Sequence, residues 1–477
     1  DGAADIDAMI SGPISGQSGA VLYKWGAGTL ALTAVNTYAG QTWLSGGGTL
    51  LLTGNASIGT AGSNVLTIGQ QFLGPGALQY NSSATSYFST INVSQSNSAT
   101  GTLNQTSSII ILSDNVNLSP TSDFSSFLNL IVFTMILRPT LSMLHPGNGA
   151  GIMTLSNTGV VTASVMAVPD YSNNPSNTKP SYGQFIQNGG SATIGLLIIS
   201  QTSYDTNPHV GSVDLNGGTL GAASITGGVA TVAGGSNTST FNFNGGTLKA
   251  TASTPVFMQG LTATYVKDGG AVIDSDGYDI TIAQALLHAA GATTSPLVKN
   301  GTGTLTLTGA NTLIGPVTIN TGTLVLTGAT QFASGRLSTA ISNHGSLIFA
   351  GSADQVLAGA ITGSGALTKS GAGTLTLTGA TPYSGATTIL AGQLVVFSGG
   401  SLSNSAVTLN AGALLNMYVE SGNDQWVCKG LTLTGETATV RLHFSSIVPS
   451  QPVAPILVQG DFVNQATLTI SNDGRIV

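Results

Sequence analysis

The chain has 477 residues, and only 6% of them are Lys, Arg, Asp or Glu, whereas an average soluble domain carries about 25% charged residues. A net charge of −7 with 11 basic residues excludes nucleic-acid binding, which depends on many Lys and Arg contacts to phosphates. Hydrophobic residues make up 41% of the chain, which excludes conventional disorder. What remains is an apolar, nearly uncharged chain that contains 65 glycines.

The first recurring segment covers residues 24–51. It begins Lys24-Trp-Gly-Ala-Gly-Thr-Leu-Ala-Leu-Thr and continues to a second Gly-Thr-Leu at Gly48. The same unit returns at 299–326 and 369–396, and shorter Asn-Gly-Gly-Thr-Leu echoes begin at Asn216 and Asn244. Self-similarity of this kind indicates a repeat architecture in which neighbouring units share one core.

The regularity weakens over residues 55–188, where prolines and Asn- and Ser-rich runs accumulate. We interpret this part as long loops protruding from a continuing solenoid, with an insertion near 123–144; a separate subdomain is the alternative. The longest apolar stretch lies here, at Phe127 to Leu137. It is shorter than the 18 or more residues of a membrane-spanning helix, so we predict no membrane span in this chain.

The densest acidic group contains Asp268, Asp274, Asp276 and Asp279. The pattern Asp274-Ser-Asp276-Gly, followed by Asp279, is compatible with a calcium loop because Ca²⁺ needs several closely spaced oxygen ligands. A turn stabilised by Asp side chains is the structural alternative. We name Asp274, Asp276 and Asp279 as a weak calcium candidate and predict no catalytic residue, no other metal site and no cofactor.

The copy at 299–326 shows the physical logic of the unit. Thr304-Leu305-Thr306-Leu307-Thr308 alternates strictly, which predicts a strand with Leu side chains buried and Thr side chains exposed. Glycines punctuate the strands where the chain must bend. The strands are short and their connections are too short for helical crossovers. We therefore predict an all-β fold, a right-handed parallel β-helix (β-solenoid) with protruding loops, continuous over residues 1–477.

Lys24, Lys299 and Lys369 occupy the same position in the three copies. This recurrence favours a structural role in the turn, since a catalytic residue is usually unique. Glu420 and Glu436 are the only glutamates, and no nucleophile, zinc or phosphate-loop motif is present. We therefore predict that the protein is not an enzyme. The lone Cys428 excludes an intrachain disulfide and is predicted to be buried.

The unit Lys-x-Gly-x-Gly-Thr-Leu-Thr-Leu-Thr-Gly-Ala-Asn, with its trailing Gly-Thr-Leu, resembles the autotransporter-associated β-strand repeat. That resemblance implies an exported β-solenoid and a secreted or cell-surface location in a bacterium. It implies no particular activity, because the family includes adhesins, enzyme carriers and proteins of unknown role.

Three functions are compatible with these observations. The first is a non-enzymatic structural subunit of an extracellular fibre or surface layer, a homo-oligomer or filament that associates through solenoid ends or edges. The second is an autotransporter passenger that acts as an adhesin. The third is a β-helix enzyme that degrades polysaccharides. Aromatic residues expected in loops provide a way to contact glycans, cell surfaces or a neighbouring subunit: Trp25, Tyr38, Trp43, Tyr171, Tyr182 and Tyr204.

Overall fold

A computed structural model describes most of the chain, with gaps. The described residues are 6–17, 19–59, 64–69, 76–82, 84–88, 90–93, 101–105, 109–112, 116–118, 126–130, 134–137, 140–144, 150–170, 180–200, 203, 206–328, 332–397, 400, 402–419, 425–435, 437–444, 456–464 and 469–472. The chain divides into two compact units, Asp1–Thr251 with Met258–Thr264, and Ala252–Phe257 with Tyr265–Val477. We describe each unit by itself, and the prediction of one continuous solenoid stays a prediction.

Unit 1 begins with short strands and contains three long strands, β17 (Val160–Asp170), β18 (Ser181–Ile199) and β19 (Pro208–Gly227), further along the chain. Its strands are β1 (Ala8–Ile10), β2 (Val21–Lys24), β3 (Thr29–Leu32), β4 (Gln41–Leu44), β5 (Gly48–Gly54), β6 (Val65–Ile68), β7 (Gly76–Ser82), β8 (Ser86–Phe88), β9 (Thr90–Val93), β10 (Gly101–Gln105), β11 (Ile109–Leu112), β12 (Val116–Leu118), β13 (Ser126–Leu130), β14 (Thr134–Leu137), β15 (Thr140–Leu144), β16 (Ala150–Leu155), β17 (Val160–Asp170), β18 (Ser181–Ile199), β19 (Pro208–Gly227), β20 (Ser236–Phe243) and β21 (Thr247–Ala250). Strands β22 (Thr254–Gln259) and β23 (Ala263–Val266) contain residues of both units.

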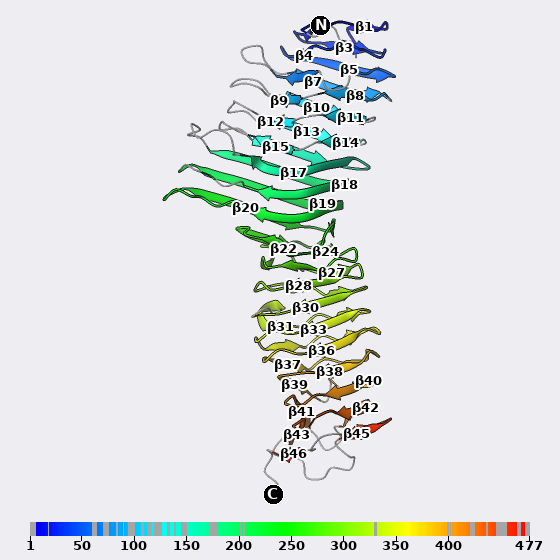
Figure 1. Cartoon of the computed structure of the whole chain (residues 1–477), viewed down its shortest axis with the longest axis vertical. Coiled ribbons are helices and arrows are strands. Elements are labelled where there is room, and N and C mark those ends of the chain that lie inside the picture. Colours follow the sequence, from blue (N-terminus) through cyan, green and yellow to red (C-terminus); the bar gives the residue numbers. More distant parts are fainter. Residues whose placement is uncertain are drawn as a thin grey trace. The chain divides into compact units, whose positions relative to one another are not determined.

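Unit 2 keeps its strands short throughout (Figure 1). They are β24 (Ala271–Asp274), β25 (Ile280–Ile282), β26 (Leu286–His288), β27 (Leu297–Asn300), β28 (Thr304–Leu307), β29 (Val317–Ile319), β30 (Thr323–Leu326), β31 (Arg336–Leu337), β32 (Ile341–Asn343), β33 (Ser346–Phe349), β34 (Gln355–Leu357), β35 (Ile361–Thr362), β36 (Ala366–Lys369), β37 (Thr374–Leu377), β38 (Thr387–Ile389), β39 (Gln393–Val396), β40 (Leu402–Leu409), β41 (Leu414–Val419), β42 (Trp426–Leu433), β43 (Thr439–Phe444), β44 (Ile456–Val458), β45 (Phe462–Asn464) and β46 (Thr469–Asn472). One 3₁₀ turn, η1, covers Ala333–Gly335. Within the described residues, no helix is long and apolar enough to cross a membrane.

Strands pair in parallel with strands from the next turn of the chain. In unit 1, for example, Gly48 of β5 lies opposite Gly76 of β7, which in turn lies opposite Gly101 of β10. In unit 2, Leu305 of β28 lies opposite Leu324 of β30. Parallel ladders between successive coils, with no helical crossover in the described connections, define a parallel β-solenoid. The predicted fold class is confirmed.

The segment expected to hold an insertion, 123–144, contains three strands whose backbone the structure describes. Strand β13 pairs in parallel with β10 and β16, β14 with β11 and β17, and β15 with β12 and β17. The strands of this segment therefore continue the ladders on both sides. The residues that connect these strands, like the Asn- and Ser-rich run at 171–179, lie outside the described residues.

The turns at 341–377 reveal how many strands make one coil of unit 2. Strands β32, β33 and β34 pair in order with β35, β36 and β37 of the next coil. Each of these coils therefore has three strands. The third strand of each belongs to a separate seven-stranded sheet that also contains β31, β39, β41, β43 and β46.

The core forms as the alternation predicts. Leu305 and Leu307 are fully buried, whereas Thr304 and Thr306 are half-buried on the outside. Burial of each such Leu stabilises the fold by about 1.5–3 kcal/mol. The predicted strand phase is therefore confirmed.

Unit 2 also has a continuous row of outward-facing residues on paired strands, which we call the outer stripe. Its members are paired from coil to coil, and each carries a β-branched, uncharged side chain that suits an exposed strand position. The outer stripe consists of Thr281, Thr306, Val325, Ile348, Thr368, Thr388, Thr408, Thr432 and Val463.

Candidate functional site

The predicted calcium residues lie in and after the turn that follows β24. The Oδ1 atom of Asp274 accepts a hydrogen bond of 2.8 Å from the backbone N–H of Asp276, which has a positive φ of 50°. This is the Asp-stabilised turn that we considered as the alternative. In the described part of the chain, no group of three or more His, Cys, Asp or Glu side chains is placed to hold a metal ion.

Asp279 joins two coils. Its Oδ1 atom accepts a hydrogen bond of 2.8 Å from the backbone N–H of Thr304, the first residue of β28 in the next coil. Its own backbone N–H donates to the Oγ atom of Ser253 at 3.1 Å. The hydrogen bonds from Thr304 lower the pKa of the Asp279 carboxyl.

The same arrangement occurs at all three full repeats. Asp7 accepts the backbone N–H of Thr29 at 2.5 Å, and Asp354 accepts the backbone N–H of Thr374 at 2.6 Å. In each copy, an Asp from the preceding coil thus satisfies the first N–H of the Thr-Leu strand. This set is not recognisable in the sequence, because the number of residues from Asp to Thr differs in each copy.

The repeat lysines are buried rather than exposed in a turn. Lys24 is 9% exposed, Lys299 0% and Lys369 3%. The Nζ atom of Lys299 donates to the carbonyl oxygens of Asn300 and Gly301, both at 2.7 Å, and to the Oγ atom of Ser275 at 2.9 Å. The ammonium group therefore holds the Gly-x-Gly turn closed from inside the coil.

The other two copies repeat this contact. The Nζ atom of Lys24 donates to the carbonyl oxygen of Gly26 at 2.5 Å, and that of Lys369 donates to the carbonyl oxygen of Gly371. The predicted structural role of these lysines fits the contacts, and the structure adds their burial. The glycine directly before β30 leaves space for this ammonium group, since a Cβ at Gly322 would lie 2.8 Å from the Nζ atom of Lys299.

Burial lowers the pKa of all three lysines, because an apolar surrounding disfavours the charged form. The effect is largest at Lys299, whose pKa falls from 10.5 to about 8 although Asp274 and Asp279 act in the opposite direction. Lys299 is therefore the repeat lysine that titrates nearest to neutral pH.

A buried residue pair distinguishes one copy from the other two. In the first and third copies, a Tyr hydroxyl lies 2.5 Å from a Thr hydroxyl four residues later, in the pairs Tyr38–Thr42 and Tyr383–Thr387. In the second copy the equivalent positions hold Leu313 and Val317, which are both buried. The buried hydroxyls are thus present or absent together, as expected if each requires a partner.

This pair corrects one of the aromatic predictions. Tyr38 lies in the connection before β4, but it is only 2% exposed and is part of the core, so it is not available to a glycan. Trp25 is 65% exposed and Tyr182 41%, whereas Trp43 packs edge-to-face against Tyr23. Tyr171 and Tyr204 lie outside the described residues. Cys428 is buried as predicted, and burial raises the pKa of its thiol to about 11.

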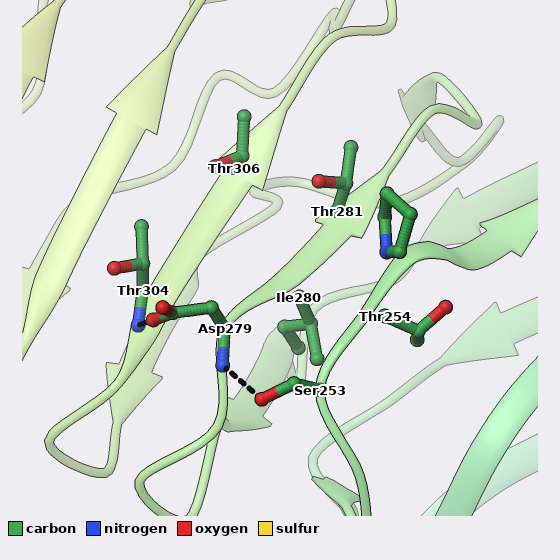
Figure 2. A pocket seen from close by; sticks show the side chains of 8 residues that line it. Ser253, Thr254, Asp279, Ile280, Thr281, Thr304 and Thr306 are labelled. Atoms are coloured by element: carbon green, nitrogen blue, oxygen red, sulfur yellow. Dashed lines mark hydrogen bonds between the residues drawn. The ribbon is translucent and has the colours of Figure 1, made fainter.

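An open groove of about 420 Å³ lies beside Asp279 in unit 2. Figure 2 shows Thr281 and Thr306 on neighbouring strands, with Ser253 and Asp279 joined by a hydrogen bond. The full lining is Ser253, Thr254, Pro255, Asp279, Ile280, Thr281, Thr304 and Thr306. The groove is therefore rich in hydroxyl groups and contains one carboxylate.

Comparison with known proteins agrees with the repeat geometry. A family model described as the passenger-associated-transport-repeat matches residues 22–52, 297–326 and 367–396. No curated protein and no solved structure matches the chain. The chain therefore carries three passenger-associated transport repeats, which imply an exported, cell-surface protein.

Proposed function

We propose that this chain is a non-enzymatic structural part of the bacterial cell exterior, a rigid β-solenoid subunit of a fibre or surface layer. The observation that carries the proposal is that the charged side chains of the repeats form hydrogen bonds to backbone groups of the coils. The buried lysines close turns, and the aspartates of the preceding coils hold the strands that follow. These groups serve the stacking of coils, and Asp274 stabilises the turn that follows β24 by accepting the backbone N–H of Asp276.

Association between copies is part of this proposal. Sheets that pack face to face need flat surfaces without unpaired charges. The outer stripe offers nine successive β-branched, uncharged positions on one face of unit 2. Two such faces can interdigitate as the layers of a β-sandwich do.

Electron microscopy and sedimentation at rising protein concentration test the association. We expect ordered assemblies from the native chain and weaker assembly from Thr368→Lys, which places a charge on the outer stripe. Thr376→Lys is the matched control, because Thr376 is an equally half-buried Thr on the other sheet. Dispersed monomers at every concentration, or equal effects of the two variants, would contradict the proposal.

An adhesin passenger is the second function, and the passenger-associated repeats favour it as well. Display of the chain on the surface of a cell that lacks it distinguishes the adhesin from the structural subunit. Adhesion to host or matrix surfaces without assembly favours the adhesin, whereas assembly without adhesion favours the structural subunit. Degradation of pectin- or glucan-type polymers that stops with Asp274→Asn or Asp276→Asn would instead establish the enzyme.

A further inference from the structure

The groove beside Asp279 has a floor of paired strands. Thr281 of β25 and Thr306 of β28 are register partners, and both face outward because their neighbours Ile280, Ile282 and Leu305 are buried. Strand β28 also pairs with β30 on its other side. The ladder groups of the floor are therefore already used, so an extended peptide cannot bind here by adding a strand.

The rim of the groove supplies additional hydroxyl groups. Thr254 lies at its edge, and its Oγ1 atom accepts the backbone N–H of Val256 at 3.2 Å. Pro255 has no N–H, so the backbone donates no ladder hydrogen bond at that residue. Ser253 accepts the N–H of Asp279, which leaves its own hydroxyl hydrogen for another acceptor.

The lining set determines the chemical class of a ligand. It contains five Ser or Thr hydroxyls and the Asp279 carboxylate, and it contains neither a cation nor an aromatic ring. Because Asp279 is the one charged residue in this lining, the groove disfavours anionic ligands. The same carboxylate has about four lone-pair positions, and the hydrogen bonds from Thr304 occupy only part of them.

We propose that this groove is a binding site for a neutral carbohydrate, with the Asp279 carboxylate accepting hydrogen bonds from sugar hydroxyls and the Thr281, Thr304 and Thr306 side chains lining its floor and edge. The volume of about 420 Å³ is within the range of small-molecule sites. The site lacks the aromatic surface that gives such sites most of their affinity. We therefore expect a dissociation constant on the order of 1 mM for one sugar unit or two.

Thr281 and Thr306 also belong to the outer stripe, so association along the whole stripe would cover the groove, whereas copies that associate through solenoid ends leave it open and hold many weak sites close together. Multivalent binding raises avidity by about 10²–10⁴ when several sites are engaged together. The binding site goes beyond the structural function and does not depend on it, since a single dispersed chain would also bind.

The repeats provide matched controls for the test. Thr376 is the counterpart of Thr306 in the third copy, and Asp354 holds Thr374 as Asp279 holds Thr304. Neither Thr376 nor Asp354 lines the groove. A substitution that only disturbs folding of the repeat should therefore have the same effect at the groove residue and at its counterpart. A substitution that disturbs binding should have an effect only at the groove residue.

The experiment is saturation-transfer NMR and calorimetric titration of the full chain with cellobiose, maltose and N,N′-diacetylchitobiose, and with digalacturonate as the anionic comparison. We expect at least one neutral disaccharide to bind, about tenfold weaker binding with Thr306→Arg, and several-fold weaker binding with Asp279→Asn. Thr376→Arg and Asp354→Asn should leave binding unchanged.

Three results would overturn the proposal. The first is that none of the neutral disaccharides binds at concentrations up to roughly 10 mM. The second is that the groove variants and their controls weaken binding equally. The third is that digalacturonate binds as tightly as the neutral sugars. Melting temperatures of all four variants identify any loss that comes from unfolding.

Discussion

At the scale of single residues, the repeat lysine is a charged group placed inside a β-solenoid. Lys299 is fully buried, and its Nζ atom donates to the backbone carbonyls of Asn300, Gly301 and Thr321 and to one Ser hydroxyl. A buried charge is tolerated only when its hydrogen-bonding capacity is satisfied. The Lys299 ammonium group donates hydrogen bonds to the turn carbonyls, and its burial lowers its pKa.

The lowered pKa of Lys299 makes the alkaline stability of the chain predictable. Between about pH 8 and pH 10, the unfolded chain holds a proton on this residue that the folded chain has released. The unfolding free energy should therefore rise with pH in this window because of Lys299, by up to about 1 kcal/mol per pH unit. Chemical denaturation at several pH values measures this slope.

Lys299→Met is the control for that slope. The variant removes the titrating group, so the difference in unfolding free energy between native chain and variant should increase with pH over the same window. A constant difference would show that Lys299 is not the source of the effect.

The hydroxyl pair in the first and third copies gives a second prediction. Thr387→Val should cost about 1–3 kcal/mol, because it removes the hydroxyl that contacts both the buried Tyr383 and the buried Ser405 hydroxyls. Adding Tyr383→Phe should recover part of this loss, since the two apolar residues then resemble Leu313 and Val317 of the second copy. Denaturant unfolding of the single and double variants gives the coupling energy.

The second copy allows the converse substitution, which introduces a buried hydroxyl without a partner. Val317→Thr buries a hydroxyl opposite Leu313, which carries no polar group, and should be destabilising by a similar amount. Additive effects of Thr387→Val and Tyr383→Phe would count against the paired role of the two hydroxyls.

At the scale of strands and turns, alternation and close stacking decide the structure. Leu305 points into the dry core, and Thr306 points outward from the same strand. Leu305→Asp should cost several kcal/mol because it buries an unpaired charge, whereas Thr306→Asp should cost little. Thermal melting of the two variants tests the strand phase, and equal effects would contradict it.

Turn glycines have two separable roles. Gly303 is needed for close stacking, since a Cβ there would lie 1.9 Å from the carbonyl oxygen of Tyr278 in the preceding coil. Gly291 has a positive φ of 82°, and a Cβ at this position would meet no atom within 4 Å. We expect Gly303→Ala to disrupt the coil and Gly291→Ala to cost about 1 kcal/mol from backbone strain alone. Folded yield and melting temperature compare the two, and a milder effect at Gly303 would refute the stacking role.

At the scale of the whole molecule, the scarcity of charge governs the response to conditions. Asp268 and Asp279 have lowered pKa values because Thr side chains and backbone N–H groups donate to their carboxylates. Their contribution is complete above the unfolded pKa of about 4 and is lost as the pH falls through the folded values. Stability supplied by these groups should therefore be constant from pH 7 to pH 5.

Calorimetric melts across pH and salt check this expectation. We expect similar melting temperatures at pH 7 and pH 5, a decline below about pH 4, and little change between low and high salt, since few ion pairs are available for screening. A sharp decline between pH 7 and pH 5 would show that other titrating groups control the fold.

Much of the fold follows from local pattern alone. The Thr-Leu alternation determines strand phase because side chains on a strand point to opposite faces in turn. The recurrence of the Lys-x-Gly-x-Gly unit indicates a coil, and the low charge and missing motifs restrict the classes of function. These properties depend only on residues that are neighbours in the sequence.

The contacts between coils required the tertiary structure. Asp7, Asp279 and Asp354 serve equivalent strands, but they precede them by different numbers of residues because the coils differ in length. The burial of Tyr38 and of the lysines, and the groove beside Asp279, likewise depend on which coil stacks on which. Local sequence therefore sets the phase and composition of each strand, whereas the stacking of the coils sets which of their side chains meet.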